Sequence, residues 1–144
     1  MDQLHAAAAV RNIFAQAFNS NWVVSERHLV SAYLLAKQAF AEKENTGKTR
    51  ETETLLKAAA TTQIQEAIAR AGISSTQKIF LLTDAEDDQF AALLKELGAT
   101  ECPAAYSPDV KLIAETLGFT KEQLANYSLE GLVLEAVALA GNEN

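Results

Sequence analysis

The sequence predicts a single α/β domain over residues 1–144, with a small mixed or antiparallel sheet of about three to four strands and about six to seven flanking helices. Three observations support this fold class. Several segments carry apolar residues at the three- and four-residue spacing of amphipathic helices. A continuous apolar run at residues 79–82 is typical of a central strand. Two prolines and six glycines force few breaks in the chain.

The composition is that of an ordinary globular domain, with 49% hydrophobic and 22% charged residues among 144. The formal charge of −7 repels phosphate backbones, which argues against an autonomous, general nucleic-acid binder. The single cysteine, Cys102, excludes an internal disulfide and fits a reducing compartment. No apolar run approaches the ~20 residues of a membrane span, and the N-terminus has no signal-peptide pattern. We therefore expect a cytoplasmic protein, also nuclear if the source is eukaryotic, without membrane contact.

The N-terminal third is expected to be mainly helical. Residues 3–18 place apolar side chains at helical spacing. After a break at residues 19–21 and a short extended entry, Ser25 can cap a second helix. A polar loop at residues 42–48 follows and is the longest candidate for a flexible segment.

Glycines and capping residues divide the C-terminal half. Gly72 suits a helix C-terminus before the strand-like run, and Asp84 can cap a helix that Gly98 ends. Residues 101–104 predict a short edge strand, because the proline there cannot donate a ladder hydrogen bond. Three further helices are expected, with the following start and end signals: Ser107-Pro108 and Gly118, Thr120, and Ser128 and Ala140.

The sequence lacks a recognisable set of catalytic or metal-binding residues. Residues 47–49 are the Gly-Lys-Thr end of a phosphate-binding loop, but Glu42 stands where that loop requires another glycine. The acidic run at residues 84–88 lacks the spacing of a calcium loop and suits the first turn of a helix. The two histidines and the cysteine form no familiar zinc set, and nothing marks an orienting acid or an oxyanion hole. We therefore expect a protein without catalytic activity, cofactor or metal ion.

The last predicted helix is apolar almost all round. One face carries residues at helical spacing: Leu129, Leu132, Val133, Ala136, Val137 and Ala140. The opposite face holds Gly131, Leu134 and Ala138, with only Glu130 and Glu135 charged. A helix of this kind is normally buried on both sides. We therefore expect one face to pack on the core and the other to meet a protein partner.

A longer pattern, residues 53–73, reads E-T-L-L-K-A-A-A-T-T-Q-I-Q-E-A-I-A-R-A-G-I and is followed by the strand-like run at residues 78–83. Together with residues 24–33 and 127–135, it resembles the TPRKB/CGI-type small kinase-binding subunit of the KEOPS complex. That family pairs with the atypical kinase PRPK in tRNA threonylcarbamoylation. The resemblance covers roughly residues 21–140 and rests on order and spacing rather than on one diagnostic motif.

The resemblance implies a non-catalytic accessory subunit that binds the amino-terminal lobe of a PRPK-like kinase and supports tRNA N6-threonylcarbamoyladenosine modification. On this basis we expect a monomer alone and a heterodimer with the kinase. The implied kinase-binding residues lie on the last helix, with Leu134 and Ala138 facing outward: Leu132, Val133, Leu134, Ala136 and Ala138. The implied contacts to the tRNA 3′ end lie at the polar loop and at the next helix start: Lys48, Arg50, Thr62 and Gln63.

The resemblance also implies a strand over residues 52–59 and then a helix capped near Thr61 or Thr62. Propensity alone favours one helix over residues 51–71, and we adopt the strand because the two threonines can interrupt a helix. Many relatives carry Gly and Arg where this chain has Ala60 and Thr62. Without that arginine, direct tRNA binding is expected to be weak.

The family begins with a strand before its first helix, and the predicted N-terminal helix leaves no room for it. The sheet is therefore expected to have an open edge. Two other functions stay open. The chain could be a self-associating scaffold that uses the last helix or the open sheet edge and has no tRNA role. It could also be a small-molecule binder or an unrecognised enzyme that uses a cleft near residues 61–63.

Overall fold

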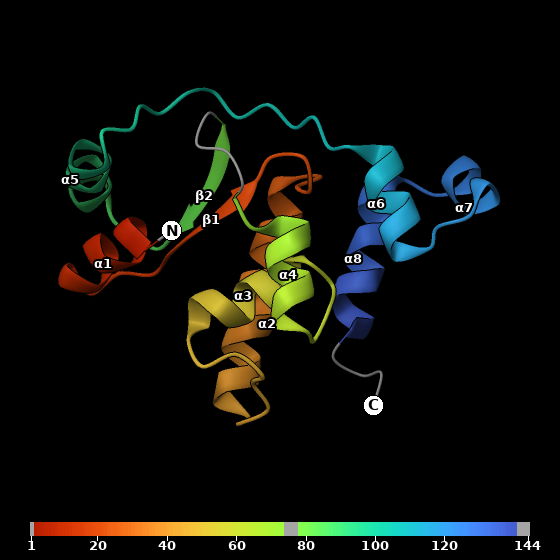
Figure 1. Cartoon of the computed structure of the whole chain (residues 1–144), viewed down its shortest axis with the longest axis horizontal. Helices are drawn as coiled ribbons and strands as arrows, with labels where there is room; N and C mark the ends of the chain where they lie inside the picture. The colour runs from red at the N-terminus through yellow and green to blue at the C-terminus, as the bar shows by residue number, and fades with distance from the viewer. Residues whose placement is uncertain (1, 74–77, 141–144) are drawn as a thin grey trace.

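The computed structural model describes residues 2–73 and 78–140, which form eight helices and two strands (Figure 1). In chain order the elements are α1 (Asp2–Val10), β1 (Ala15–Asn19), α2 (Glu26–Ala41), α3 (Arg50–Ala58), α4 (Ile64–Ala71), β2 (Ile79–Thr83), α5 (Asp87–Leu97), α6 (Val110–Leu117), α7 (Lys121–Asn126) and α8 (Leu129–Leu139). The α/β class is confirmed, but this part of the chain has fewer strands and more helices than predicted. No helix within it is long and apolar enough to cross a membrane.

The two strands separate two unequal clusters of buried side chains. They pair antiparallel, with Ala15 opposite Thr83. Figure 1 shows α1 and α5 on one side of the strands and α2, α3 and α4 on the other. Ala15 and Ala17 of β1 pack with Leu93 of α5 in a small cluster made mostly of alanine. Phe18 of the same strand belongs to the larger core.

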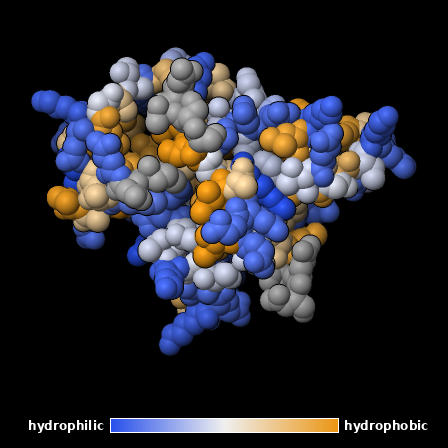
Figure 2. Space-filling view, in the orientation of Figure 1, coloured by the Kyte–Doolittle hydropathy of each residue, from blue (hydrophilic) through white to orange (hydrophobic). Residues whose placement is uncertain are grey.

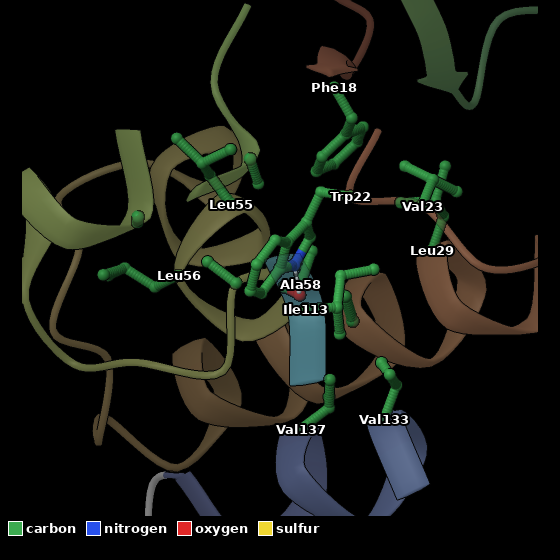
Figure 3. Close-up of a cluster of buried hydrophobic side chains, with 14 residues drawn as sticks. Phe18, Trp22, Val23, Leu29, Leu55, Leu56, Ala58, Ile113, Val133 and Val137 are labelled. Carbon is green, nitrogen blue, oxygen red and sulfur yellow. Dashed lines mark hydrogen bonds between the residues drawn. The ribbon is translucent and has the colours of Figure 1, made fainter. Parts of the chain in front are cut away.

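Trp22 lies in the middle of the larger core (Figure 3). Its side chain is 1% exposed, and its indole N–H donates to the carbonyl oxygen of Ala58 at 2.9 Å. Val133 and Val137 of α8 belong to the same cluster, as does Ile113 of α6. The larger core therefore holds α8 against α2 and α3.

His28 is fully buried near the start of α2 and contacts the same carbonyl. Its Nδ1 accepts the backbone N–H of Val24 at 3.3 Å, so Nε2 carries the hydrogen and donates to the oxygen of Ala58 at 2.8 Å. Burial lowers the pKa of His28, while the Ala58 carbonyl and Glu130 act in the opposite direction. The neutral ring ties the start of α2 to the end of α3.

The predicted helix ends are confirmed at several positions. Ser25, Thr120 and Ser128 each accept a backbone N–H from the first turn of α2, α7 and α8. Gly98 and Gly118 end α5 and α6 with φ of 66° and 77°, a left-handed conformation that glycine adopts without a Cβ clash. The strand predicted at residues 79–82 is confirmed as β2, although it is not a central strand.

The helix predicted over residues 3–18 is wrong beyond Val10. The chain turns at Asn12, whose φ of 54° asparagine tolerates better than most residues, and β1 follows. Residues 14–18 are all buried. Their apolar run therefore fits either period, and pairing with β2 decides for the strand. β1 thus adds a strand before α2 that the sequence analysis did not predict, although α1 still precedes it.

The strand predicted over residues 52–59 is also wrong, because this segment is the helix α3. Thr49 caps the helix by accepting a backbone N–H from its first turn, and leucine, lysine and alanine favour helix over strand. The continuous helix over residues 51–71 does not form either. Ala60 adopts a φ of 56°, which ends the first helix before α4 begins. The break between the two segments is thus confirmed.

The edge strand predicted at residues 101–104 is wrong. Residues 99–109 have no regular structure and cross from α5 to α6 along the top of Figure 1. Their contact with the sheet is made by a side chain, because Tyr106 stacks on Phe80 of β2 with 4.7 Å between ring centroids. In the described part of the chain, the sheet therefore has two strands instead of three to four.

Two helices begin later than predicted. Asp84 does not cap α5, because its carboxylate accepts the backbone N–H of Phe14 at 2.8 Å. Glu86 is the cap instead, in a reciprocal pair of hydrogen bonds with Gln89. In α6 the cap is Asp109 rather than the serine before the proline. In both helices, two neighbouring polar residues could cap the first turn, and the one nearer to the helix does so.

Candidate protein-binding site

The predicted kinase-binding residues lie on two sides of α8, one that faces the core and one that faces the surface. Leu132 and Val133 are 7% and 1% exposed and pack inside the domain. They are therefore not surface residues of the folded chain, contrary to our expectation. Leu134 and Ala136 are half-buried, and Ala138 is exposed. Only the last three can reach a partner without unfolding α8.

α2 lies beside α8 and adds exposed apolar side chains that the sequence analysis missed. Arg27 and Glu130 form an ion pair of 3.9 Å at the starts of the two helices, which run in the same direction in Figure 1. Val30 and Leu34 follow Arg27 by one and two turns and are 39% and 56% exposed. Leu134 follows Glu130 by one turn. We call Val30, Leu34, Leu134 and Ala138 together the α2–α8 face.

α4 carries a second exposed apolar stripe. Ile64 and Ile68 are spaced by four residues and are 43% and 51% exposed, while Ala67 and Ala71 on the opposite side are fully buried. Figure 2 shows hydrophobic side chains on the front of the molecule over α3 and α4. The period of this helix could be found in the sequence. The side that faces the core could not be found in this way, because the buried residues are small alanines and the exposed ones are large isoleucines.

The four predicted tRNA contacts are all exposed but form two separate groups. Lys48 and Arg50 lie at the start of α3, and Thr62 and Gln63 lie in the turn after its end. A helix of nine residues is about 13 Å long, so one local site cannot contain all four.

The turn that carries Thr62 and Gln63 is fixed by side chains. Arg70 donates to the carbonyl oxygen of Ala59 at 3.0 Å and pairs with Glu66 at 3.2 Å. The Thr61 hydroxyl donates to the same carboxylate at 2.8 Å. The guanidinium of Arg70 thus places a positive charge beside the C-terminus of α3, which is the negative end of its dipole.

The described residues offer little for chemistry. No group of three or more His, Cys, Asp or Glu among them could hold a metal ion. Cys102 is exposed and free. His28 is committed to two backbone hydrogen bonds inside the core. The exposed apolar stripes are therefore the candidate site.

Exposed apolar stripes on packed helices are typical of a protein-binding domain. This chain belongs to the CGI-121 family, whose sequence model, described as kinase binding protein CGI-121, matches residues 1–141. The resemblance stated from the sequence is thus confirmed. No curated protein matches the chain.

Proposed function

We propose that this chain is a non-catalytic accessory subunit that binds a PRPK-like atypical kinase within a KEOPS-type complex, and so supports tRNA N6-threonylcarbamoyladenosine modification. The observation that carries the proposal is the exposed α2–α8 face in a chain of the CGI-121 family. This role places the protein in the cytoplasm, and also in the nucleus if the source is eukaryotic.

The α2–α8 face has the properties expected for the centre of a protein interface. Burial of a fully exposed leucine or valine side chain contributes about 1.5–3 kcal/mol, and Val30 and Leu34, which are 39% and 56% exposed, contribute up to about half of that when a partner covers them. The Arg27–Glu130 ion pair lies at one end of the face, as polar groups do at the rim of an interface. A stable complex of standard size buries about 1,600 Å² in total, so we expect the partner to extend beyond these four residues.

Calorimetric titration with a PRPK-type kinase from the same source tests the proposal. We expect saturable one-to-one binding near or below about 1 μM. Leu34→Glu and Leu134→Glu are expected to weaken it at least about tenfold, since each buries a charge in an apolar contact. Val10→Glu is the matched control, because Val10 is 85% exposed on α1.

Leu134 is half-buried, so its variant could unfold the chain. Leu34→Glu tests the same face without this risk, because Leu34 is 56% exposed and tolerates a charge in the free protein. If Leu34→Glu folds and binds like the wild type, α2 is not part of the kinase surface. If the well-folded wild type does not bind the kinase, the proposal fails.

We also propose that Lys48 and Arg50 contact the tRNA 3′ end, with Thr62 and Gln63 as a second point. The support is local: within the described part of the chain, neither Lys48 nor Arg50 makes an ion pair, and both are exposed. The net charge of −7 keeps the affinity of the isolated chain low. The double substitution Lys48→Ala with Arg50→Ala is expected to lower RNA affinity and to reduce its salt dependence by about 0.7 per lost phosphate contact.

Self-association is the second candidate function, and the exposed stripe of Ile64 and Ile68 on α4 favours it. Light scattering on the isolated chain decides between them. A monomer at micromolar concentration supports the accessory-subunit proposal. A dimer that Ile68→Glu dissociates, while Leu34→Glu does not, supports self-association through α4.

A further inference from the structure

The loop between α2 and α3 is held by a buried carboxylate. Glu53 of α3 is 2% exposed, and its Oε1 accepts the backbone N–H of Thr46 at 2.9 Å and of Gly47 at 2.7 Å. The side-chain amide of Asn45 donates to the carbonyl oxygen of Gly47 at 2.8 Å. The longest candidate for a flexible segment is thus attached to a helix by charge-assisted hydrogen bonds.

Gly47 makes this attachment possible. A Cβ at this position would lie 2.9 Å from the backbone nitrogen of Glu53, which is closer than Cβ atoms are found, and 3.0 Å from Cγ2 of Thr52, which is tighter than most Cβ contacts. The loop therefore approaches α3 in a way that other residues would obstruct. Lys57 lies one turn further along α3, with its Nζ 3.8 Å from the second carboxylate oxygen of Glu53, and offsets the buried charge.

The same contacts explain why the Gly-Lys-Thr sequence does not form a nucleotide site. In a phosphate-binding loop, backbone N–H groups point at the phosphate. Here the N–H groups of Thr46 and Gly47 point at the carboxylate of Glu53. An anion of the chain itself fills the position, and the loop is hydrogen-bonded to α3 without a ligand.

Free cations are concentrated around this loop. Among the described residues, four of the twelve Lys and Arg side chains form ion pairs: Arg11, Arg27, Lys57 and Arg70. Of the others, Lys43, Lys48 and Arg50 lie within eight positions of one another, and all three are exposed. Lys48 and Arg50 flank the cap of α3 and immediately follow the residues that Glu53 binds.

We infer that Glu53 is a positioning residue for RNA binding: it fixes the loop so that Lys48 and Arg50 form a preformed site for the phosphates of single-stranded RNA. This inference rests on the proposed RNA contact and deepens it. A fixed loop loses less conformational freedom when the ligand binds, so the affinity is higher than that of a mobile loop with the same charges.

The sign of the effect separates positioning from simple electrostatics. Removing a negative charge next to two cations strengthens RNA binding if only charge matters. If Glu53 acts by fixing the loop, its removal weakens RNA binding. Glu44→Gln is the matched control, because within the described part of the chain this exposed loop carboxylate has no hydrogen bond or ion pair.

Fluorescence anisotropy with a labelled short single-stranded oligoribonucleotide measures this effect on the full chain and on its kinase complex. We expect Glu53→Ala to weaken binding by about three- to tenfold, Glu53→Gln by less, and Glu44→Gln to leave it unchanged or stronger. In the Lys48→Ala, Arg50→Ala background, Glu53→Ala is expected to have no further effect. If Glu53→Ala weakens RNA binding as much in that background as in the wild type, Glu53 does not act through these cations.

Hydrogen exchange distinguishes loop ordering from loss of the fold. In Glu53→Ala we expect faster exchange of the Thr46 and Gly47 amides, with unchanged exchange in α8 and unchanged kinase binding. Faster exchange throughout the chain, with weaker kinase binding, overturns a positioning role. So does wild-type RNA affinity in a folded Glu53→Ala variant. If the wild type binds no RNA, the proposed RNA contact fails as well. If the wild type binds RNA, and the Lys48→Ala, Arg50→Ala variant binds it more weakly but Glu53→Ala does not, the RNA contact is supported and the role of Glu53 is not.

Discussion

The two buried clusters on either side of β1 differ in the size of their side chains. The larger one contains Trp22, Phe18 and branched residues from four helices, and two donors bind one carbonyl at Ala58. The smaller one holds α1 and α5 with four alanines and two leucines. Large side chains with directional hydrogen bonds fix the relative orientation of helices, whereas alanines only allow close approach. The proposed kinase-binding face lies on α2 and α8, which both contribute to the larger cluster.

The largest expected effect is that of Trp22→Ala. We expect it to lower the free energy of unfolding by about 3–5 kcal/mol, because it leaves a cavity and removes one of the two donors to the Ala58 carbonyl. Urea denaturation measures this change. Trp22→Phe retains most of the apolar volume and is expected to cost less. A Trp22→Ala variant no less stable than the smaller-cluster variant described next would contradict the comparison.

Leu93→Ala probes the smaller cluster. We expect a loss of about 2–3 kcal/mol, because the leucine is fully buried but its neighbours are small. Kinase affinity is expected to be unchanged in conditions where the variant is folded, since the described residues that cluster with Leu93 come from other elements than α2 and α8. The same titration on Trp22→Phe is expected to give weaker binding. Equal kinase affinities for Leu93→Ala and Trp22→Phe would mean that the two clusters do not differ in their effect on kinase binding.

The pH dependence of stability tests the hydrogen bonds of the larger cluster. Burial lowers the pKa of His28, so in acid the unfolded chain binds a proton that the folded chain does not. The contribution is fully present above about pH 6.5 and is lost as the pH falls below it, by at most about 1.4 kcal/mol per pH unit. Denaturation of wild type and His28→Gln at a series of pH values measures the difference. Parallel curves would mean that His28 does not titrate in this way.

The smallest expected effect is a stabilisation at the turn between α3 and α4. Ala60 has a φ of 56°, which costs a residue with a Cβ about 1–2 kcal/mol. Ala60→Gly removes this strain and adds some freedom to the unfolded chain, so we expect a net gain of about 0.5–1 kcal/mol. Ala59→Gly is the control and is expected to destabilise, because Ala59 has a φ of −81°. Thermal denaturation of both variants gives the comparison.

Local signals in the sequence were enough to find several helix ends. Ser25, Thr120 and Ser128 cap helices because a short side-chain oxygen next to the backbone satisfies a free N–H, whatever the rest of the fold does. Gly98 and Gly118 end helices for an equally local reason. The family was also recognisable, because order and spacing along the chain do not depend on how the chain folds.

Other features could not be found in this way. The apolar run at residues 14–18 fits a helix or a strand, and only the pairing with β2 decides between them. The residues of α3 favour a helix locally, and adopting the strand from the resemblance led to an error. For the candidate site, Leu134 and Ala138 were predicted on the accessible side of α8. Val30, Leu34 and the isoleucines of α4 were missed, because their exposure depends on which side of each helix faces the core.

The sequence by itself therefore determined the α/β class, the family and several of the helix caps. All of these depend on residues close together in the chain or on their order. Only the tertiary structure decided that Leu132 and Val133 are buried, that α2 joins α8 in one face, and that Glu53 holds the loop with Lys48 and Arg50. These facts depend on packing and hydrogen bonds between segments, because burial is a property of the assembled core.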